Sequence, residues 1–243
     1  DFEEFCWAMG LTESVWSMAC DAAKAREPLP DFLYDRLLGL FHRYMMVGGM
    51  PDAVSAFVES GNIDRVRAVH GNLHALYRQD ITKYAPEELR LVIRDIYDLI
   101  PSELGSKNRR FKLSSIQGVK RFAQVTDHFL WLAKAGVALP VYNVAAPTSP
   151  LLFGEQRSLF KLFYLDTGML MSSYPKSVAQ AVLSGDAAGE FGMNMGAAYE
   201  GFVAQELKAH GFAPRYFSSK KIGELDFVEE RQDGGILAIE VKS

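Results

Sequence analysis

Apolar residues in the first hundred positions recur at the three- and four-residue spacing of amphipathic helices. One such run stops at Gly48-Gly49-Met50-Pro51, a typical helix terminator. A second run covers residues 63–84, and Pro86 then suits the first turn of another helix, which we expect Pro101 to end. The pattern predicts a helical region over residues 1–100. The apolar positions of the first run are Phe32, Leu33, Leu37, Leu40, Phe41 and Tyr44.

From residue 101 onward the pattern changes to helix followed by strand-like sequence. Residues 119–135 place apolar side chains on one helical face, and Gly136 is a natural C-cap. Residues 137–143 and 160–165 have the composition of two strands that pair across a proline-containing loop. Ser114-Ser115 can cap a further short helix before this one. Because two helices and then a hairpin is the order of a winged helix, residues 101–183 are predicted to form a winged-helix-like domain.

The last sixty residues have an α/β pattern. A predicted helix over residues 197–210 ends at Gly211 and precedes three short strands. Turns containing Gly223 and Asp233-Gly234-Gly235 separate these strands. Residues 184–243 are therefore predicted to form a third, α/β domain, and the whole chain to be α+β and mostly helical. The three predicted strands are residues 214–218, 224–229 and 236–242.

Composition narrows the class of protein. Hydrophobic residues make up 49% and charged residues 23%, a balance typical of packed globular proteins. The net charge of -4 excludes a uniformly basic nucleic-acid coat but allows a local basic patch. Two cysteines without a CxxC pair favour the reducing cytoplasm. The longest apolar stretch contains Lys134 and Pro140, so no membrane span is predicted.

Four charged residues near the C-terminus have the order of a metal site. Glu240 and Lys242 lie two apart in a predicted strand, so their side chains project from the same face. Asp226 lies within an apolar strand, where an unpaired carboxylate is costly. Glu200 lies on the preceding helix, beside the apolar face that packs on the sheet.

These residue types are suited to metal-assisted phosphodiester hydrolysis. Carboxylates bind hard cations such as Mg²⁺, and a nearby lysine can orient water or stabilise phosphate charge. Asp226, Glu240 and Glu200 are thus the predicted Mg²⁺ ligands, with Lys242 as a further catalytic residue. The alternative is a solvated pair of Glu240 and Lys242 on an edge strand, with Asp226 capping a turn. The order of helix Glu, strand Asp and strand Glu-x-Lys favours the metal site.

Several segments have sequences similar to one known family. They are residues 1–5, 48–51, 78–81, 160–168, 198–207, 223–228 and 239–242. Together they resemble the C-terminal region of prokaryotic AAA-type ATPases, whose last domain is of uncharacterised function and similar to PD-(D/E)xK nucleases. The resemblance implies that Glu200, Asp226, Glu240 and Lys242 are nuclease signature positions. It also implies a lid or linker role for the first hundred residues and a DNA-directed enzyme.

In that family a P-loop ATPase domain precedes the region seen here. The sequence contains no GxxxxGK[ST], so ATP binding is expected only in the full-length protein. The first residue is Asp1 rather than Met, and we expect a piece of a longer polypeptide. Leu225 replaces the proline of the nuclease pattern, and the chain ends at Ser243, before the helix that covers the last strand. An alternative function is therefore a non-catalytic interaction or regulatory module coupled to the ATPase domain.

A basic cluster leads into the predicted winged helix. Such a cluster can bind DNA phosphates or can be an ordinary solvated surface. Winged helices also dock proteins, so the expected partner is DNA or another protein, in a monomer or an oligomer. The cluster consists of Lys107, Arg109, Arg110, Lys112, Lys120 and Arg121.

His70 and His74 have the i and i+4 spacing of a helical zinc site. However, Gly71 occupies the position where a zinc protease carries its glutamate. This substitution favours a surface or core pair of histidines over a metal site.

Overall fold

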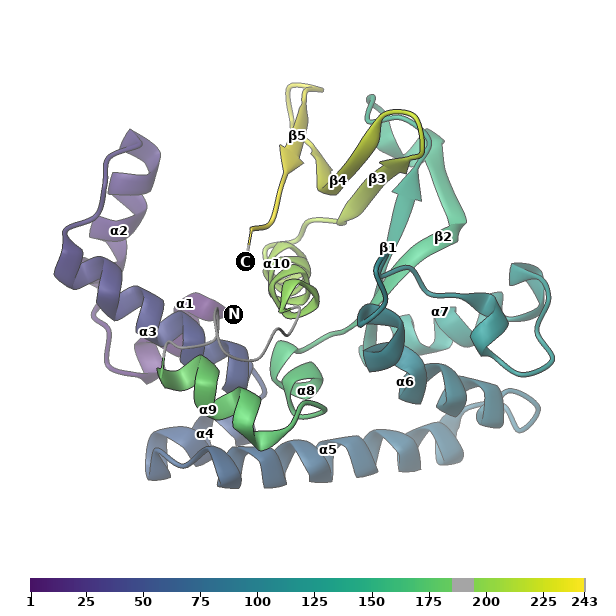
Figure 1. The fold of residues 1–243 in the computed structure, drawn as a ribbon, viewed down its shortest axis with the longest axis horizontal. Coiled ribbons are helices and arrows are strands. Elements are labelled where there is room, and N and C mark those ends of the chain that lie inside the picture. The colour runs from purple at the N-terminus through teal and green to yellow at the C-terminus, as the bar shows by residue number, and fades with distance from the viewer. Residues whose placement is uncertain (185–194, 243) are drawn as a thin grey trace. The chain divides into compact units, whose positions relative to one another are not determined.

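The computed structural model describes residues 1–184 and 195–242. These residues form ten α-helices and one five-stranded mixed sheet, which confirms the predicted α+β class (Figure 1). They divide into two compact units. The helical unit comprises residues 1–73 and the described part of 166–193, and the sheet unit comprises residues 74–165 and the described part of 194–243. Within the described ranges, no helix combines the length and apolarity needed to cross a membrane.

The helical unit is built around a long central helix. Its helices are α1 (Phe2–Ala8), α2 (Glu13–Ala25), α3 (Asp31–Val47), α4 (Pro51–Ser60), the first half of α5 (Ile63–Tyr84), α8 (Thr167–Met171) and α9 (Lys176–Ser184). Helices α8 and α9 pack against α3. Tyr44 of α3 is fully buried, and its ring lies 5.5 Å from that of Phe2 and 5.1 Å from that of Phe5. The apolar spacing seen in the sequence therefore forms the core of this unit.

A buried carboxylate joins the α3–α4 turn to the start of α8. Asp166 caps α8, since its Oδ1 accepts the N–H of Met169 at 3.1 Å. Its Oδ2 accepts the N–H of Gly49 at 2.6 Å. At Gly168 an added Cβ would lie 2.6 Å from the carbonyl oxygen of Val47, so only glycine fits. Two segments more than a hundred residues apart thus form one closely packed joint.

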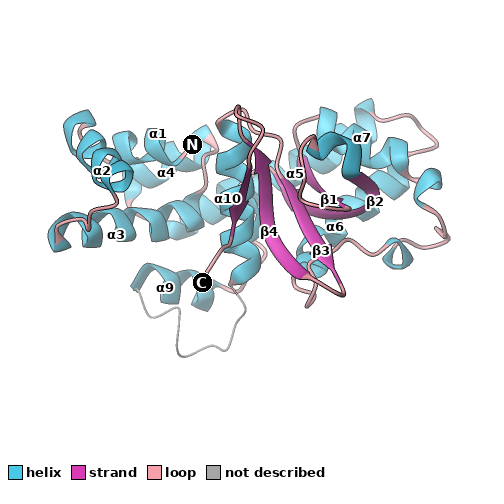
Figure 2. Ribbon diagram, turned by 90° about the horizontal axis from the view of Figure 1, so that it is seen from above, coloured by secondary structure: helices cyan, strands magenta, loops and turns pink. Residues whose placement is uncertain are grey.

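The sheet unit contains all five strands. Its elements after α5 are α6 (Arg90–Leu104), η1 (Leu113–Ser115), η2 (Phe122–Gln124), α7 (Thr126–Lys134), β1 (Ala138–Val144), η3 (Leu151–Gly154), β2 (Glu155–Tyr164), α10 (Gly196–Ala209), β3 (Arg215–Ser219), β4 (Gly223–Glu230) and β5 (Ile236–Ile239). The strand order is β2-β1-β3-β4-β5, and Figure 2 shows β1 to β4 in the sheet. Among the strands of the described residues, β1 and β3 pair in parallel, and the other neighbours are antiparallel.

Successive residues of β2 face different helices. The ring of Phe160 lies 4.7 Å from that of Phe129 on α7. The next residue, Lys161, forms an ion pair with Glu200 on α10. Because side chains alternate across a strand, α7 and α10 cover opposite faces of the sheet at β2. This arrangement positions the charged groups described below.

Pro101 does not end its helix, contrary to the prediction. Helix α6 continues to Leu104 with Pro101 inside it. A proline lacks the N–H that would bond the carbonyl oxygen four residues earlier, which here belongs to Tyr97. The hydroxyl of Tyr164 donates to that oxygen at 3.0 Å. A tertiary hydrogen bond therefore compensates for the local defect.

The compact units do not coincide with the predicted domains, which were divided at residues 100/101 and 183/184. The expected hairpin is present as β1 and β2, and helix α7 precedes it. However, β1 also pairs with β3, so the hairpin is part of a sheet that extends into the C-terminal region. The hairpin of the predicted winged-helix-like unit, residues 101–183, is thus part of a larger sheet, and the winged-helix-like domain itself stays a prediction.

Candidate functional site

A β-bulge lies at Asp226. Strand β3 pairs with β4 so that Arg215 faces Val228 and Phe217 faces Leu225. Two steps along β3 therefore match three steps along β4, and the register shift falls beside Asp226. Bulges change the direction of a side chain and occur often next to active sites. Here the bulge interrupts the pairing of β4 at the signature aspartate.

The register of β4 with β5, continued one step past its last pair, would set Asp226 opposite Glu240. Phe227 faces Ile239 and Val228 faces Ala238 in this antiparallel ladder. Glu240 lies just beyond the end of β5. Consistent with this register, Asp226 Oδ2 accepts the N–H of Val241 at 2.8 Å. Directly opposed residues have Cβ atoms roughly 5 Å apart, which is a suitable separation for sharing a cation.

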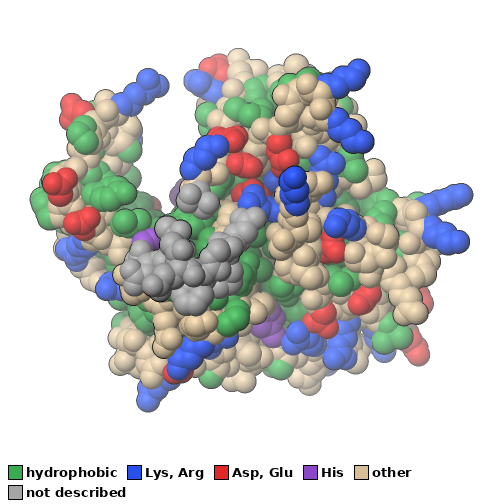
Figure 3. Space-filling view, viewed as in Figure 1, with side chains coloured by type: hydrophobic (Ala, Val, Ile, Leu, Met, Phe, Trp, Pro, Cys, Tyr) green, Lys and Arg blue, Asp and Glu red, His purple; other side chains and the backbone are tan. Residues whose placement is uncertain are grey.

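Lys242 lies on the same exposed edge. Its Nζ donates to Glu240 Oε1 at 2.9 Å, and side-chain exposure is 79% for Lys242 and 49% for Glu240. The hydrogen bond and charge of Glu240, with a smaller contribution from Asp226, raise the pKa of Lys242. Figure 3 shows acidic and basic side chains intermingled over β4 and β5. The lysine thus places a positive charge beside two carboxylates.

Glu200 has a different environment from the other three predicted site residues. It lies on α10 and is only 1% exposed. Arg109 donates to its Oε1, and Lys161 donates to its Oε2 at 2.9 Å. Both oxygens of this carboxylate are therefore engaged by cations of the chain itself.

Lys161 is the site residue that the sequence analysis missed. It is 1% exposed, and its Nζ lies 3.0 Å from Glu224 Oε1 and 5.1 Å from the ring centroid of Tyr216. Burial lowers the pKa of Lys161, while the charges of Glu224 and Asp226 oppose that shift. The available signal was a single lysine inside the apolar run Phe160–Leu165, because a lysine buried in a strand requires an acidic partner.

The carboxylates only partly fit a divalent cation. Asp226 and Glu240 offer the oxygen ligands that Mg²⁺ prefers. Glu200 is held by Arg109 and Lys161. Among the described residues, no group of three or more His, Cys, Asp or Glu side chains is placed to hold a metal ion. The arrangement therefore suits a cation held by two carboxylates, with water completing its coordination.

The predicted basic cluster is divided between buried contacts and exposed side chains. Arg109 pairs with Glu200, and Arg110 donates to the Ser218 hydroxyl and lies 5.8 Å from the ring centroid of Tyr216. These two arginines therefore link the segment after α6 to the sheet and α10. The four exposed members of the cluster are Lys107, Lys112, Lys120 and Arg121.

The two histidines at i and i+4 are core residues. His70 is fully buried, and its Nε2 lies 3.0 Å from the carbonyl oxygen of Val47. His74 is 8% exposed, and its Nδ1 lies 2.5 Å from the hydroxyl of Tyr97. Each ring is held by a hydrogen bond of its own, as expected for core histidines.

Comparison with known protein families gives two matches. A family described as a domain of unknown function, DUF8612, matches residues 38–178, more than half of the chain. A second domain of unknown function, DUF4143, matches residues 195–243 and is typically found at the C-termini of AAA-type ATPases. No curated protein and no solved structure matches the chain.

Proposed function

The chain belongs to the DUF8612 family of domains of unknown function, and we propose that it is the C-terminal part of an AAA-type ATPase that cleaves DNA. The cleavage site is the edge of the sheet at Asp226, Glu240 and Lys242, and Mg²⁺ is its cofactor. ATP binds only to the P-loop domain of the full-length protein. In this proposal the nuclease chemistry resides in residues 195–243.

The proposal is supported by the register of β4 and β5, whose continuation by one step beyond the pair Phe227 and Ile239 would set Asp226 opposite Glu240. Two facing carboxylates repel one another unless a cation lies between them. Lys242 provides one cation, but its side chain is 79% exposed, and its ammonium group forms an ion pair with Glu240. A divalent cation can therefore replace this weak surface pair at low cost.

Each residue then has a defined role. Asp226 and Glu240 bind Mg²⁺, and the N–H of Val241 keeps the Asp226 carboxylate in place. When bound, Mg²⁺ would polarise the scissile phosphate and lower the pKa of a coordinated water. Lys242, released from Glu240, donates a hydrogen bond to the attacking water or to a phosphate oxygen. Glu200 is a positioning residue rather than a ligand, because Arg109 and Lys161 engage both of its oxygens.

The two cationic side chains that pair with Glu200 favour a second function. Arg109 and Lys161 place two positive charges on Glu200, and this opposes a metal ion close to that carboxylate. A nuclease-like fold without a metal would serve as a non-catalytic module that couples the ATPase to DNA or to a protein partner. Metal affinity distinguishes the two functions.

The test combines calorimetric titration of Mn²⁺ and Mg²⁺ with cleavage of plasmid DNA by the same preparation. We expect Asp226→Asn to abolish metal binding and cleavage. Lys242→Met retains metal binding and lowers cleavage by roughly 100-fold or more. Asp233→Asn and Lys221→Met are matched controls, since Asp233 is 62% exposed in the β4–β5 turn and Lys221 is exposed at the β3–β4 turn.

The outcomes separate the alternatives. Wild-type cleavage by both Asp226→Asn and Lys242→Met would assign the chemistry to other residues. A folded wild-type chain that binds no divalent cation and cleaves no DNA would favour the non-catalytic module.

A further inference from the structure

A pocket lies in the sheet unit, formed by strands β1, β2 and β3 with the ends of α7 and α10. Its volume is about 400 Å³, within the range of small-molecule sites. None of Asp226, Glu240 or Lys242 lines it. The pocket is therefore separate from the proposed metal site.

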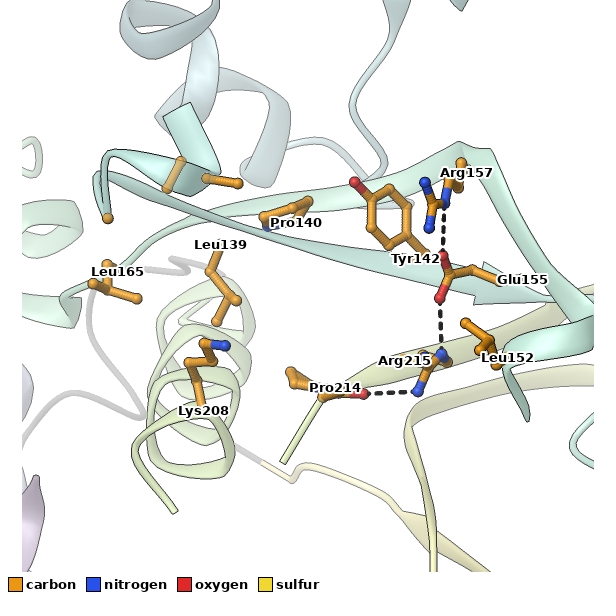
Figure 4. Close-up of a pocket in the computed structure, with 14 residues that line it drawn as sticks. Leu139, Pro140, Tyr142, Leu152, Glu155, Arg157, Leu165, Lys208, Pro214 and Arg215 are labelled. Carbon is orange, nitrogen blue, oxygen red and sulfur yellow. Dashed lines mark hydrogen bonds and ion pairs between the residues drawn. The ribbon is translucent and has the colours of Figure 1, made fainter. Parts of the chain in front are cut away.

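One wall of the pocket carries two guanidinium groups paired with one carboxylate. Glu155 accepts from Arg157 Nε at 3.0 Å and from Arg215 Nε at 2.9 Å, as Figure 4 shows. The Glu155 side chain is 7% exposed, and that of Arg215 is 16% exposed. Arg215 also donates to the carbonyl oxygen of Ala213 at 3.2 Å. The carboxylate thus holds the largely buried Arg215 in place before any ligand arrives, which reduces the entropy lost on binding, and it also pairs with the exposed Arg157.

The charges lining the pocket favour an anion. Arg157, Arg215 and Lys208 carry three positive charges, and Glu155 carries one negative charge, so the lining has a net charge of about +2. Arg157 and Lys208 are exposed and keep polar hydrogens available to a ligand. Guanidinium groups fit phosphate oxygens in a bidentate manner.

The rest of the pocket is apolar and contains flat surfaces. The ring of Tyr142 lies beside Arg157, and Pro140 continues the same strand towards Leu139 (Figure 4). Lys208 approaches this apolar end from α10 (Figure 4). The pocket therefore has a cation at each end and an apolar middle part with rings. This arrangement suits a flat base that is flanked by phosphate.

We propose that this pocket binds one nucleotide, with its base against Tyr142 and Pro140 and its phosphate at Arg157 or Lys208. The same chemistry is offered by a free nucleotide and by an unpaired nucleotide of a DNA strand. Nucleotide binding by this pocket does not depend on whether the sheet edge at Asp226 and Glu240 cleaves DNA.

The experiment is a calorimetric titration of the whole chain in EDTA, so that the metal site does not contribute. The ligands are dAMP, dTMP, inorganic phosphate, deoxyadenosine and a ten-residue single strand of thymidylate. We expect dAMP or dTMP to bind at least about tenfold more tightly than phosphate or deoxyadenosine, because only the nucleotide uses both parts of the pocket. A strand that binds more tightly than the mononucleotides identifies DNA as the source, and equal affinity identifies the free nucleotide; both results support the site.

Three variants locate the binding. Arg157→Gln and Lys208→Gln each remove an exposed charge, and Ala213→Leu fills the pocket from an exposed position. Ala213→Leu, and whichever of the two charge variants removes the cation that binds the phosphate, are each expected to weaken nucleotide binding by roughly tenfold. Arg231→Gln is the control, because Arg231 pairs with Asp233 in the β4–β5 turn, outside the pocket. The proposal is overturned if neither nucleotides nor the strand bind, if phosphate or deoxyadenosine binds as tightly as the nucleotides, or if the three pocket variants bind like the control.

Discussion

The Nζ atom of Lys161 lies 2.9 Å from Oε2 of Glu200, and both side chains are 1% exposed. This pair joins β2 to α10, and Arg109 and Glu224 extend it into a chain of alternating charges. A charge in such a site is costly unless a partner lies within hydrogen-bond distance. The pair therefore accounts for the position of Glu200 without a metal ion.

Replacement of Lys161 by methionine tests this pair. Lys161→Met leaves Glu200 and Glu224 without their shared cation, and we expect it to lower the unfolding free energy by roughly 3 to 5 kcal/mol. Urea unfolding, followed by the fluorescence of Trp131 on α7, measures the change. Lys221→Met, at an exposed turn, should have little effect. The double variant Lys161→Met, Glu200→Gln should be more stable than Lys161→Met alone; strictly additive losses would contradict a direct pair.

The joint at Asp166 is tested by a single methyl group. Gly168→Ala places a Cβ within 3 Å of the Val47 carbonyl oxygen and the Gly48 nitrogen, so backbone atoms must move. We expect a loss of about 2 kcal/mol or more in the stability of the helical unit. Gly39→Ala on α3 meets no atom within 4 Å and should stabilise the chain by up to about 1 kcal/mol. Thermal unfolding of both variants measures the contrast, and equal melting temperatures would contradict the joint.

Glu229 makes the stability of the sheet unit dependent on pH. It is 5% exposed, its Oε1 has no hydrogen-bond partner within the described structure, and burial raises its pKa from 4.5 to about 7. The folded state therefore favours the protonated form. The contribution of protonated Glu229 to the unfolding free energy is fully present below pH 4.5 and is lost as the pH rises through 7.

Glu229→Gln removes this dependence. At pH 5 the variant and wild type should unfold at similar urea concentrations. At pH 8 we expect the variant to be more stable by up to roughly 3 kcal/mol, since the buried charge is absent. A variant that is less stable than wild type at pH 8 would show that the ionised carboxylate is favourable.

The exposed part of the basic cluster is where we propose DNA contact. Combined replacement of Lys112, Lys120 and Arg121 by glutamine should reduce the slope of log affinity against log salt by about 2 to 3. Fluorescence anisotropy with a labelled duplex at several salt concentrations measures the slope. The control is the combined replacement of three exposed lysines outside the cluster by glutamine, which removes the same charge. These lysines are Lys24, Lys83 and Lys220. An unchanged slope would favour protein docking over DNA binding by this cluster.

Local patterns in the sequence predicted the elements well. Helix α5 has the predicted bounds, and β3, β4 and the start of β5 lie within a residue or so of their predicted positions. Capping residues and apolar spacing are local signals, so they are visible in one sequence. Helix α6 continues past Pro101 because the hydroxyl of Tyr164, which is distant in sequence, donates to the free carbonyl oxygen of Tyr97.

Long-range pairings could not be obtained in the same way. The parallel pairing of β1 and β3 joins segments more than sixty residues apart, and no local pattern specifies it. The ion pair of Lys161 and Glu200 depends on that arrangement. The order of Asp226, Glu240 and Lys242 did indicate the candidate site, but the bulge at Asp226 appears only in the register of the strands.

The most direct test of the proposed site is anomalous diffraction from crystals of the chain soaked in Mn²⁺. We predict a manganese peak bound by the carboxylates of Asp226 and Glu240, with Lys161 and Arg109 still paired to Glu200. No peak at this edge of the sheet, or a peak at Glu200 with Lys161 displaced, would contradict the two-carboxylate site.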